Sequence, residues 1–367
     1  MLDAAPRARQ GPRDVHAAHG RGPQRLCGVP CSPHVPDGPH EERGERHPVS
    51  PSRREFLYTV AGAAGGLLLG GPIPSQDAPP RLPRRTLGRT GLEVSILSIG
   101  LGAPGDGRVD PAIVQEVVEA ALDAGINLVD TAPNYELMQP TLGPIMARRR
   151  TDAFVTTKVE EHTREGALAQ IERSRREMQV DTIDVAFIHN VGDFDLSHML
   201  GLDGAFTALR QARDAGHVRF LGISGHNRPP KFAPVIRTGE VDVVMVAMNF
   251  VDRHLYNFEQ QVVPVAREHD CGIVCMKVLG GVEGWNYMNV GHARLGAPER
   301  YESAVRYALS LEGIATATMG LCNVGELQAA LDAVRRFAPL TQSELTALLA
   351  AGADLAPVWG HHLGPPT

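Results

Sequence analysis

The feature that constrains the fold most is an alternation of strand-like and helix-like segments. Nearly continuous apolar runs predict eight buried strands, at 96–101, 127–130, 153–158, 182–189, 218–224, 241–249, 273–278 and 315–320. Helical patterns follow them at 111–124, 142–149, 164–179, 202–215, 231–238, 258–269, 298–311 and 324–337. Strands that are apolar on both faces and joined by helices are typical of parallel sheets. The pattern predicts an α/β fold, a (β/α)8 TIM barrel.

A doubly wound open sheet would use the same alternation, but it usually carries Gly-x-Gly-x-x-Gly after its first strand. Here the first predicted strand runs into Gly100-Leu101-Gly102-Ala103-Pro104-Gly105, and we expect Pro104 to prevent a helix from starting there. The barrel is therefore favoured. We expect it to span 84–340, with an N-terminal hairpin at 85–95 and an extra C-terminal helix and tail within 341–367. The helix is predicted at 341–351, since Thr341 and Glu344 form a capping-box pattern.

The N-terminal region differs from the rest of the chain. Residues 1–50 are rich in Arg, Pro, His and Gly and lack apolar periodicity, which predicts a disordered leader or a stretch upstream of the true start codon. Within 51–83, the pair Arg53-Arg54 precedes the uncharged stretch 58–71 and a polar linker. This arrangement resembles a twin-arginine export signal, and a chance arginine pair before a buried helix is the alternative.

If the signal operates, the chain interacts with the twin-arginine export machinery and is exported to the periplasm. The apolar stretch 58–71 is short for a membrane span, so we expect no stable span in the mature protein. The net charge of -6 is mild, and no basic cluster in the globular part alternates with aromatic residues. Nucleic acid is therefore not an expected partner.

The number and spacing of the cysteines argue against a metal site and a disulfide framework. After the leader, the cysteines are Cys271, Cys275 and Cys322, and they lack the short spacing of a zinc or iron-sulfur site. We therefore expect neither a disulfide framework nor a bound metal.

Polar side chains end three successive predicted strands. Asp130 closes the second strand and Tyr135 lies in the loop after it, while Lys158 and His189 end the third and fourth strands. Because the C-terminal ends of barrel strands open on one face, we expect these four side chains to lie together. A buried Lys needs a charged partner, and Asp130 is the obvious one.

This group of side chains is suited to proton transfer to a carbonyl oxygen. We expect Lys158 to lower the pKa of Tyr135, which makes the phenol a general acid and base, and Asp130 to hold Lys158 charged. His189 can hydrogen-bond a carbonyl oxygen and fix its position. No nucleophilic Ser or Cys beside a base is evident, so the carbon would receive a hydride from a cofactor, NAD or NADP.

These residues resemble the aldo-keto reductase family. The similarity covers 84–337, and its most specific parts are 85–95, 125–135, 156–158 and 179–189. The resemblance implies NAD(P)-dependent interconversion of an aldehyde or ketone and its alcohol. It also implies that the family's catalytic tetrad is formed by Asp130, Tyr135, Lys158 and His189.

The resemblance also implies a set of cofactor-binding residues: Ser224, Lys277, Leu279, Gly320, Cys322 and Asn323. The turn 320–323 resembles the one whose backbone N–H groups meet phosphate at a helix N-terminus. The chain departs from the family at Gly225 and Met245, where family members carry an amide that contacts nicotinamide. Glu326, near the position expected for a 2'-phosphate, would repel that group and favours NAD or weak binding. His226, Asn227 or Arg228 could replace the missing contacts.

Two further functions stay open. The departures at Gly225, Met245 and Ala330 are compatible with an exported binding protein that has lost its cofactor. A metal-dependent barrel hydrolase or isomerase could use Asp130, His189 and His226, although such sites commonly begin with His-x-His on the first strand.

Overall fold

The computed structural model describes residues 82–106, 108–282 and 293–367. They lie within one compact unit of the chain, Pro74–Thr367. The predicted leader and almost all of the predicted export signal fall outside the described residues. The domain boundaries at 50, 83 and 340 stay predictions.

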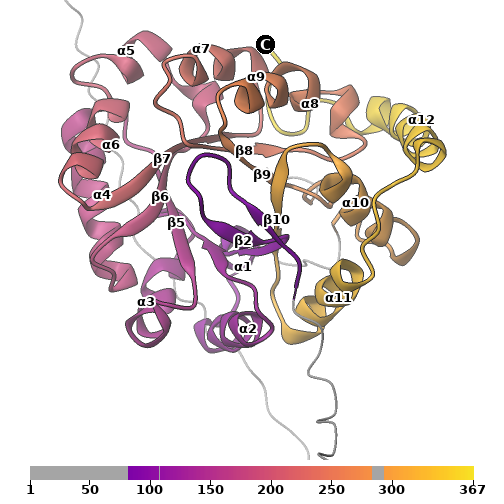
Figure 1. The fold of residues 1–367 in the computed structure, drawn as a ribbon, viewed down its shortest axis with the longest axis horizontal. Coiled ribbons are helices and arrows are strands. Elements are labelled where there is room, and N and C mark those ends of the chain that lie inside the picture. The colour runs from indigo at the N-terminus through magenta and orange to yellow at the C-terminus, as the bar shows by residue number, and fades with distance from the viewer. Residues whose placement is uncertain (1–81, 107, 283–292) are drawn as a thin grey trace, which may run out of the picture. The chain divides into compact units, whose positions relative to one another are not determined.

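The described residues form a closed barrel of parallel strands, as the sequence predicts (Figure 1). Neighbouring strands in the barrel follow chain order, and the last pairs with the first. The strands are β3 (Leu97–Gly100), β4 (Leu128–Asp130), β5 (Phe154–Val159), β6 (Ile183–Ile188), β7 (Val218–Gly225), β8 (Val243–Ala247), β9 (Gly272–Met276) and β10 (Ile314–Gly320).

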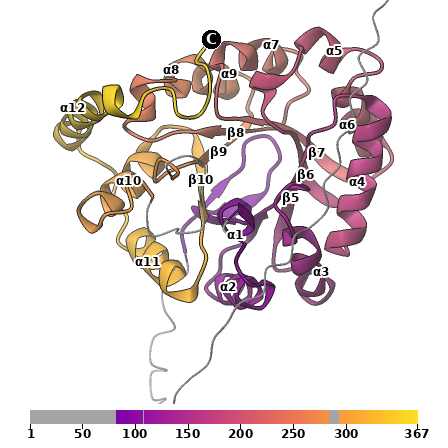
Figure 2. The same cartoon turned by 180° about the vertical axis from the view of Figure 1, so that it is seen from behind.

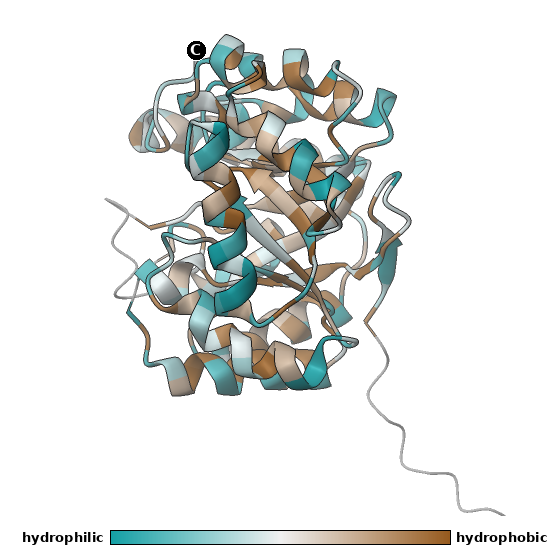
Figure 3. Cartoon of the chain, turned by 90° about the vertical axis from the view of Figure 1, so that its left-hand side faces the viewer, coloured by the Kyte–Doolittle hydropathy of each residue, from teal (hydrophilic) through white to brown (hydrophobic). Residues whose placement is uncertain are grey.

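Helices surround the barrel. The main ones are α2 (Pro111–Asp123), α3 (Met138–Arg149), α4 (Arg164–Met178), α6 (Ala205–Asp214), α7 (Phe232–Ile236), α8 (Phe258–Gln261), α9 (Val263–Glu268), α10 (Pro298–Ser310) and α11 (Val324–Arg335). Shorter pieces lie in the loops: α5 (Leu196–Leu200), η1 (Val191–Asp193), η2 (Pro229–Lys231) and η3 (Asp252–His254). Figure 3 shows the contrast between the mostly hydrophobic strands and the mixed colouring of the helices.

Two prolines change the predicted helices in opposite ways. The expectation that Pro104 prevents a helix is wrong, because α1 (Gly102–Asp106) contains it. Proline is tolerated in a first turn, where its missing N–H would have no intrahelical partner. The single helix predicted at 258–269 is divided into α8 and α9 at Val262, since Pro264 in the first turn of α9 has no N–H to continue the hydrogen bonding of α8.

The hairpin of β1 (Arg84–Thr86) and β2 (Glu93–Ser95) is confirmed and lies across the N-terminal end of the barrel (Figure 1). Its side chains Leu87, Leu92 and Val94 pack against inward-facing residues of the strands, among them Phe187 and Met245. This packing fills the barrel from below with apolar side chains. The polar residues of the strands are left to the opposite end, which Figure 2 shows with α1 in front of it.

The extra C-terminal helix is also confirmed, as α12 (Gln342–Trp359), which extends eight residues beyond the predicted end at 351. It starts with a capping box in which Thr341 and Glu344 bond each other's backbone N–H groups. In the part of the chain that the structure describes, no helix is both long and apolar enough to cross a bilayer.

Candidate active site

The four residues predicted to act together do lie together at the C-terminal end of the barrel. Asp130 is the last residue of β4 and Lys158 the last but one of β5. Lys158 Nζ lies 2.6 Å from Asp130 Oδ2 and donates to the carbonyl oxygen of Thr131 at 3.0 Å. The side chains of both partners are at most 5% exposed, so this is a buried ion pair with additional hydrogen bonds.

Asp130 is oriented by a second donor. Thr156, on the neighbouring strand β5, donates from Oγ1 to Asp130 Oδ1 at 2.7 Å. Burial lowers the pKa of Lys158, and the carboxylate of Asp130 opposes that shift. The two interactions fix the Asp130 carboxylate so that its other oxygen faces the ammonium group.

Tyr135 and His189 complete the group. Lys158 Nζ lies 4.8 Å from the centroid of the Tyr135 ring, and the rings of Tyr135 and His189 meet edge to face at 6.2 Å. The helix α1 makes room for the phenol, because a Cβ at Gly102 would come within 3.4 Å of the Tyr135 hydroxyl oxygen. A larger side chain at residue 102 would therefore press on the Tyr135 ring and hydroxyl.

One electrostatic expectation is wrong. The pKa of Tyr135 is raised well above its usual value rather than lowered, first by burial and then by the carboxylates of Asp130, Asp106 and Glu160. Lys158 is already paired with Asp130, so its positive charge is largely compensated. At neutral pH Tyr135 therefore holds its proton.

Sequence reasoning missed Glu160. Its Oε1 lies 3.1 Å from Nδ1 of His189, which makes it the polar partner of the tetrad histidine. A signal was present, since residues two apart on a strand face the same side, and Glu160 follows Lys158 by two. The predicted strand ends at Lys158, and no site residue was expected from the sequence in the loop after it.

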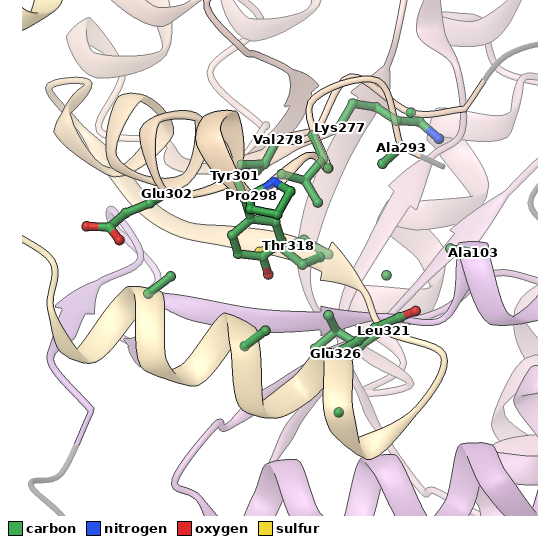
Figure 4. Close-up of a pocket in the computed structure, with 18 of the residues that line it drawn as sticks. Ala103, Lys277, Val278, Ala293, Pro298, Tyr301, Glu302, Thr318, Leu321 and Glu326 are labelled. Atoms are coloured by element: carbon green, nitrogen blue, oxygen red, sulfur yellow. The ribbon is translucent and has the colours of Figure 1, made fainter. Parts of the chain in front are cut away.

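Four of the six predicted cofactor residues line a cleft of about 730 Å³ beside the tetrad end of the barrel: Lys277, Leu279, Gly320 and Asn323. Figure 4 shows Lys277 and Ala293 at one end of this cleft, with Pro298 and Tyr301 of α10 in its middle. Its volume is in the range typical of small-molecule and cofactor sites.

The other two predicted cofactor residues are placed differently. Ser224 is fully buried and donates its hydroxyl to the carbonyl oxygen of Ile188 at 3.2 Å. Cys322 is buried beside the cleft, and its backbone N–H donates to Glu326 Oε2 at 2.8 Å. Glu326 thus takes up one of the N–H groups that the sequence reading assigned to a phosphate.

The proposed replacements after β7 also differ from one another. His226 is buried, bonds Asn190 Oδ1 through Nδ1 at 2.7 Å, and has its pKa lowered well below the usual value by burial and then by Lys277. Arg228 instead pairs with Asp193 at 2.9 Å, and Asn227 also faces Asp193. The tetrad residues His189 and Lys158 lower the pKa of His226 further.

Charge in the cleft is mixed. Carboxylates line it at Glu302, Glu326 and Asp332, and cationic groups at Lys277 and Arg336. Arg336 lies 3.4 Å from Glu302, so part of its charge is compensated within the protein. Such a lining is unfavourable for an additional phosphate dianion at the α11 end.

The described residues contain no group of three or more His, Cys, Asp or Glu side chains that could hold a metal ion. Asp130, one of the ligands considered for that alternative, is committed to Lys158 and Thr156.

A parallel barrel with Asp, Tyr, Lys and His at adjacent strand ends is typical of the aldo-keto reductases. Comparison of the chain with known protein families gives the same class. Residues 97–287 match the aldo/keto reductase family. The chain belongs to the aldo-keto reductase family of oxidoreductases, whose members usually depend on NAD(P)H.

Individual relatives are distant. The chain is 28% identical over 227 residues to D-threo-aldose 1-dehydrogenase of a Pseudomonas species, covering 51% of this chain and 67% of the relative. It is 24% identical over 216 residues to the aldo-keto reductase YhdN of Bacillus subtilis, covering 52% and 62%. A solved aldo-keto reductase from Bacillus halodurans in its holo form superposes with a TM-score of 0.61 at 22% identity, covering 73% of this chain and 95% of that one.

Proposed function

We propose that the chain interconverts an aldehyde or ketone and its alcohol, using NAD in preference to NADP, with Tyr135 as the proton-transferring residue. The observation that carries this proposal is the buried Lys158–Asp130 pair placed 4.8 Å beneath the Tyr135 ring. Such a pair is costly to bury, and a charged group held against a phenol at the mouth of a barrel is suited to catalysis.

The tetrad residues Tyr135, Lys158 and Asp130 have different roles in this reaction. In reduction Tyr135, protonated at neutral pH, gives its proton to the carbonyl oxygen, and in oxidation its phenolate form takes the proton from the alcohol. Lys158 stabilises the negative charge that appears on the phenol oxygen, and Asp130 keeps Lys158 in place. Because Asp130 and Lys158 are both buried, water screens these interactions little.

The cleft fits a dinucleotide by volume, by its position beside the tetrad and by its chemistry. Lys277 lies at one end, and Gly325 lines it at the first turn of α11, where helix N–H groups favour a pyrophosphate. When bound, the cofactor would supply or accept the hydride. The carboxylates of Glu302, Glu326 and Asp332 favour NAD over a 2'-phosphorylated nucleotide.

A direct test follows nicotinamide absorbance over a panel of carbonyls and alcohols. The panel should include aldoses, because one relative is named as an aldose dehydrogenase. Tyr135→Phe should lower kcat/KM by at least about a hundredfold, the usual worth of a general acid. Tyr307→Phe removes another tyrosine hydroxyl, outside the tetrad and the cleft, and should leave activity nearly unchanged. Undiminished activity in Tyr135→Phe would refute the mechanism.

A second candidate is a binding protein on the same scaffold. It is favoured by one observation, the Glu326 carboxylate that accepts the Cys322 N–H at the turn expected to meet phosphate. To separate the two, the mature protein is purified without added nucleotide, denatured and analysed for released NAD(P). Stoichiometric release supports the enzyme, while no release and no binding at millimolar nucleotide leaves the binding protein.

We also propose that the protein is exported, which rests on the Arg53-Arg54 pair and the short apolar stretch that follows. Export in a folded state would let the barrel carry its nucleotide with it. Cell fractionation of the wild type and of a variant with both arginines changed to lysine tests this. Export that persists unchanged in the variant would contradict it.

A further inference from the structure

The hydrogen bond between His189 and Glu160 determines which ring nitrogen of His189 can serve the substrate. Nδ1 of His189 lies 3.1 Å from Oε1 of Glu160, and His189 is only 6% exposed. An ionised carboxylate can only accept a hydrogen bond, so Nδ1 must carry the hydrogen. A neutral imidazole has one N–H, and Nε2 is then left with a lone pair.

This assignment conflicts with a simple donor role for His189. A carbonyl oxygen accepts hydrogen bonds and cannot donate one, whereas an alcohol hydroxyl can donate. We propose that Glu160 is a positioning residue that holds neutral His189 as the Nδ1–H tautomer. Nε2 can then accept a hydrogen bond from an alcohol substrate, and it can donate one to a carbonyl substrate only when His189 is protonated. The substrate part of this inference rests on the proposed function.

The surroundings of His189 favour the neutral ring. Burial lowers its pKa most, and Lys158 lowers it further, while Glu160 and Asp130 act in the opposite direction. His226, after β7, faces the same region and is electrostatically coupled to His189. The protonated Tyr135 ring covers one edge. At neutral pH the neutral ring, with its lone pair on Nε2, is therefore the dominant form of His189.

Glu160 is held so that it can perform this task. Its backbone N–H donates to Oε1 of Gln170 on α4 at 2.8 Å, and the next N–H, of Glu161, donates to the same oxygen at 3.3 Å. The loop after β5 is thereby tied to a helix. The Glu161 side chain is exposed, and within the described residues it forms no hydrogen bond to the tetrad, which makes it a matched control.

The tautomer can be observed directly in the full-length protein by long-range ¹H–¹⁵N correlation NMR of the histidine rings at pH 7.5. The His189 signals are assigned by their loss in His189→Gln. We expect the Nδ1–H pattern in the wild type and in Glu161→Ala, and the Nε2–H pattern in Glu160→Ala, where the acceptor is gone. An Nε2–H pattern for His189 in the wild type would overturn the proposal, whether or not the protein proves to be an active reductase.

Kinetics provide a second readout. In the wild type, kcat/KM for carbonyl reduction should fall by about tenfold per pH unit above the pKa of His189, because the donor form disappears. In Glu160→Ala the Nε2–H form persists and the profile should flatten, with Glu161→Ala like the wild type. Parallel profiles in two active, equally stable proteins would show that Glu160 is merely structural. If no variant is active, the proposed function fails while the NMR result still stands.

Discussion

The tetrad and the cofactor cleft lie at the same end of one barrel, but they are built differently. The tetrad rests on strand ends and is fixed by short, buried contacts, such as the 2.6 Å pair of Lys158 and Asp130. The cleft is formed largely by loops and by α10 and α11, and its charges are partly compensated among themselves, as between Arg336 and Glu302. In the proposed function, the tetrad residues are thus held rigidly, while the choice of nucleotide would depend on partly exposed, separately adjustable side chains.

The comparison predicts that damage at the tetrad costs stability as well as activity. Lys158→Met leaves the Asp130 carboxylate buried without its cation, and we expect a loss of roughly 3–5 kcal/mol in the free energy of unfolding. Activity should become undetectable. Urea denaturation followed by circular dichroism measures the first effect, and the nicotinamide assay the second.

The matched control is an exposed ion pair. Arg164 lies 3.5 Å from Asp203, with side chains 43% and 83% exposed, so Arg164→Met should cost less than about 1 kcal/mol. The double variant Asp130→Asn/Lys158→Met should recover part of the stability lost in Lys158→Met, because no unpaired charge remains. A wild-type stability for Lys158→Met would break the comparison, since the tetrad would then be no more tightly built than the surface.

A smaller effect is expected in the cleft. Glu326→Gln keeps an oxygen for the Cys322 N–H but removes the negative charge. The affinity for NADPH relative to NADH should rise roughly tenfold, or ~1.4 kcal/mol, with little change in stability. Fluorescence titration with both nucleotides measures the ratio. Glu299→Gln, an exposed carboxylate of α10 outside the cleft lining, should leave it unchanged.

The same contrast explains what the sequence could predict. Asp130, Lys158 and His189 end apolar runs, and the geometry of a parallel barrel brings strand ends together whatever the loops do. Their placement therefore followed from the strand pattern alone. The pKa of Tyr135 did not, because it depends on burial and on three carboxylates, two of which, Asp106 and Glu160, were not recognised.

Loop-dependent features were harder to predict. Ser224 donates a hydrogen bond to the carbonyl oxygen of Ile188, and the Cys322 N–H donates one to Glu326. Both contacts depend on local rotamers and not on sequence spacing. Pro104 was read as a helix breaker although a first turn tolerates it, so the position of a proline within a helix mattered more than its presence. In contrast, the capping box of α12 was readable, since it is a local pattern of four residues.

Lys277 lines the cleft, is influenced electrostatically by Lys158 of the tetrad, and gives the smallest predicted effect. Burial and then Lys158 lower its pKa to about 8, against the opposing influence of Asp106. Below that pH it is a cation that favours the nucleotide phosphates, and above it the charge is lost. NADH affinity, measured by calorimetry from pH 7 to 9, should therefore fall about fivefold, or ~1 kcal/mol. Lys277→Met should bind more weakly at pH 7 without this dependence, whereas Arg300→Met, an exposed cation outside the cleft lining, should retain it. The same pH dependence in Lys277→Met would assign the effect to another group. The nucleotide affinity would then provide no sign that the cleft and the tetrad are linked electrostatically through Lys277.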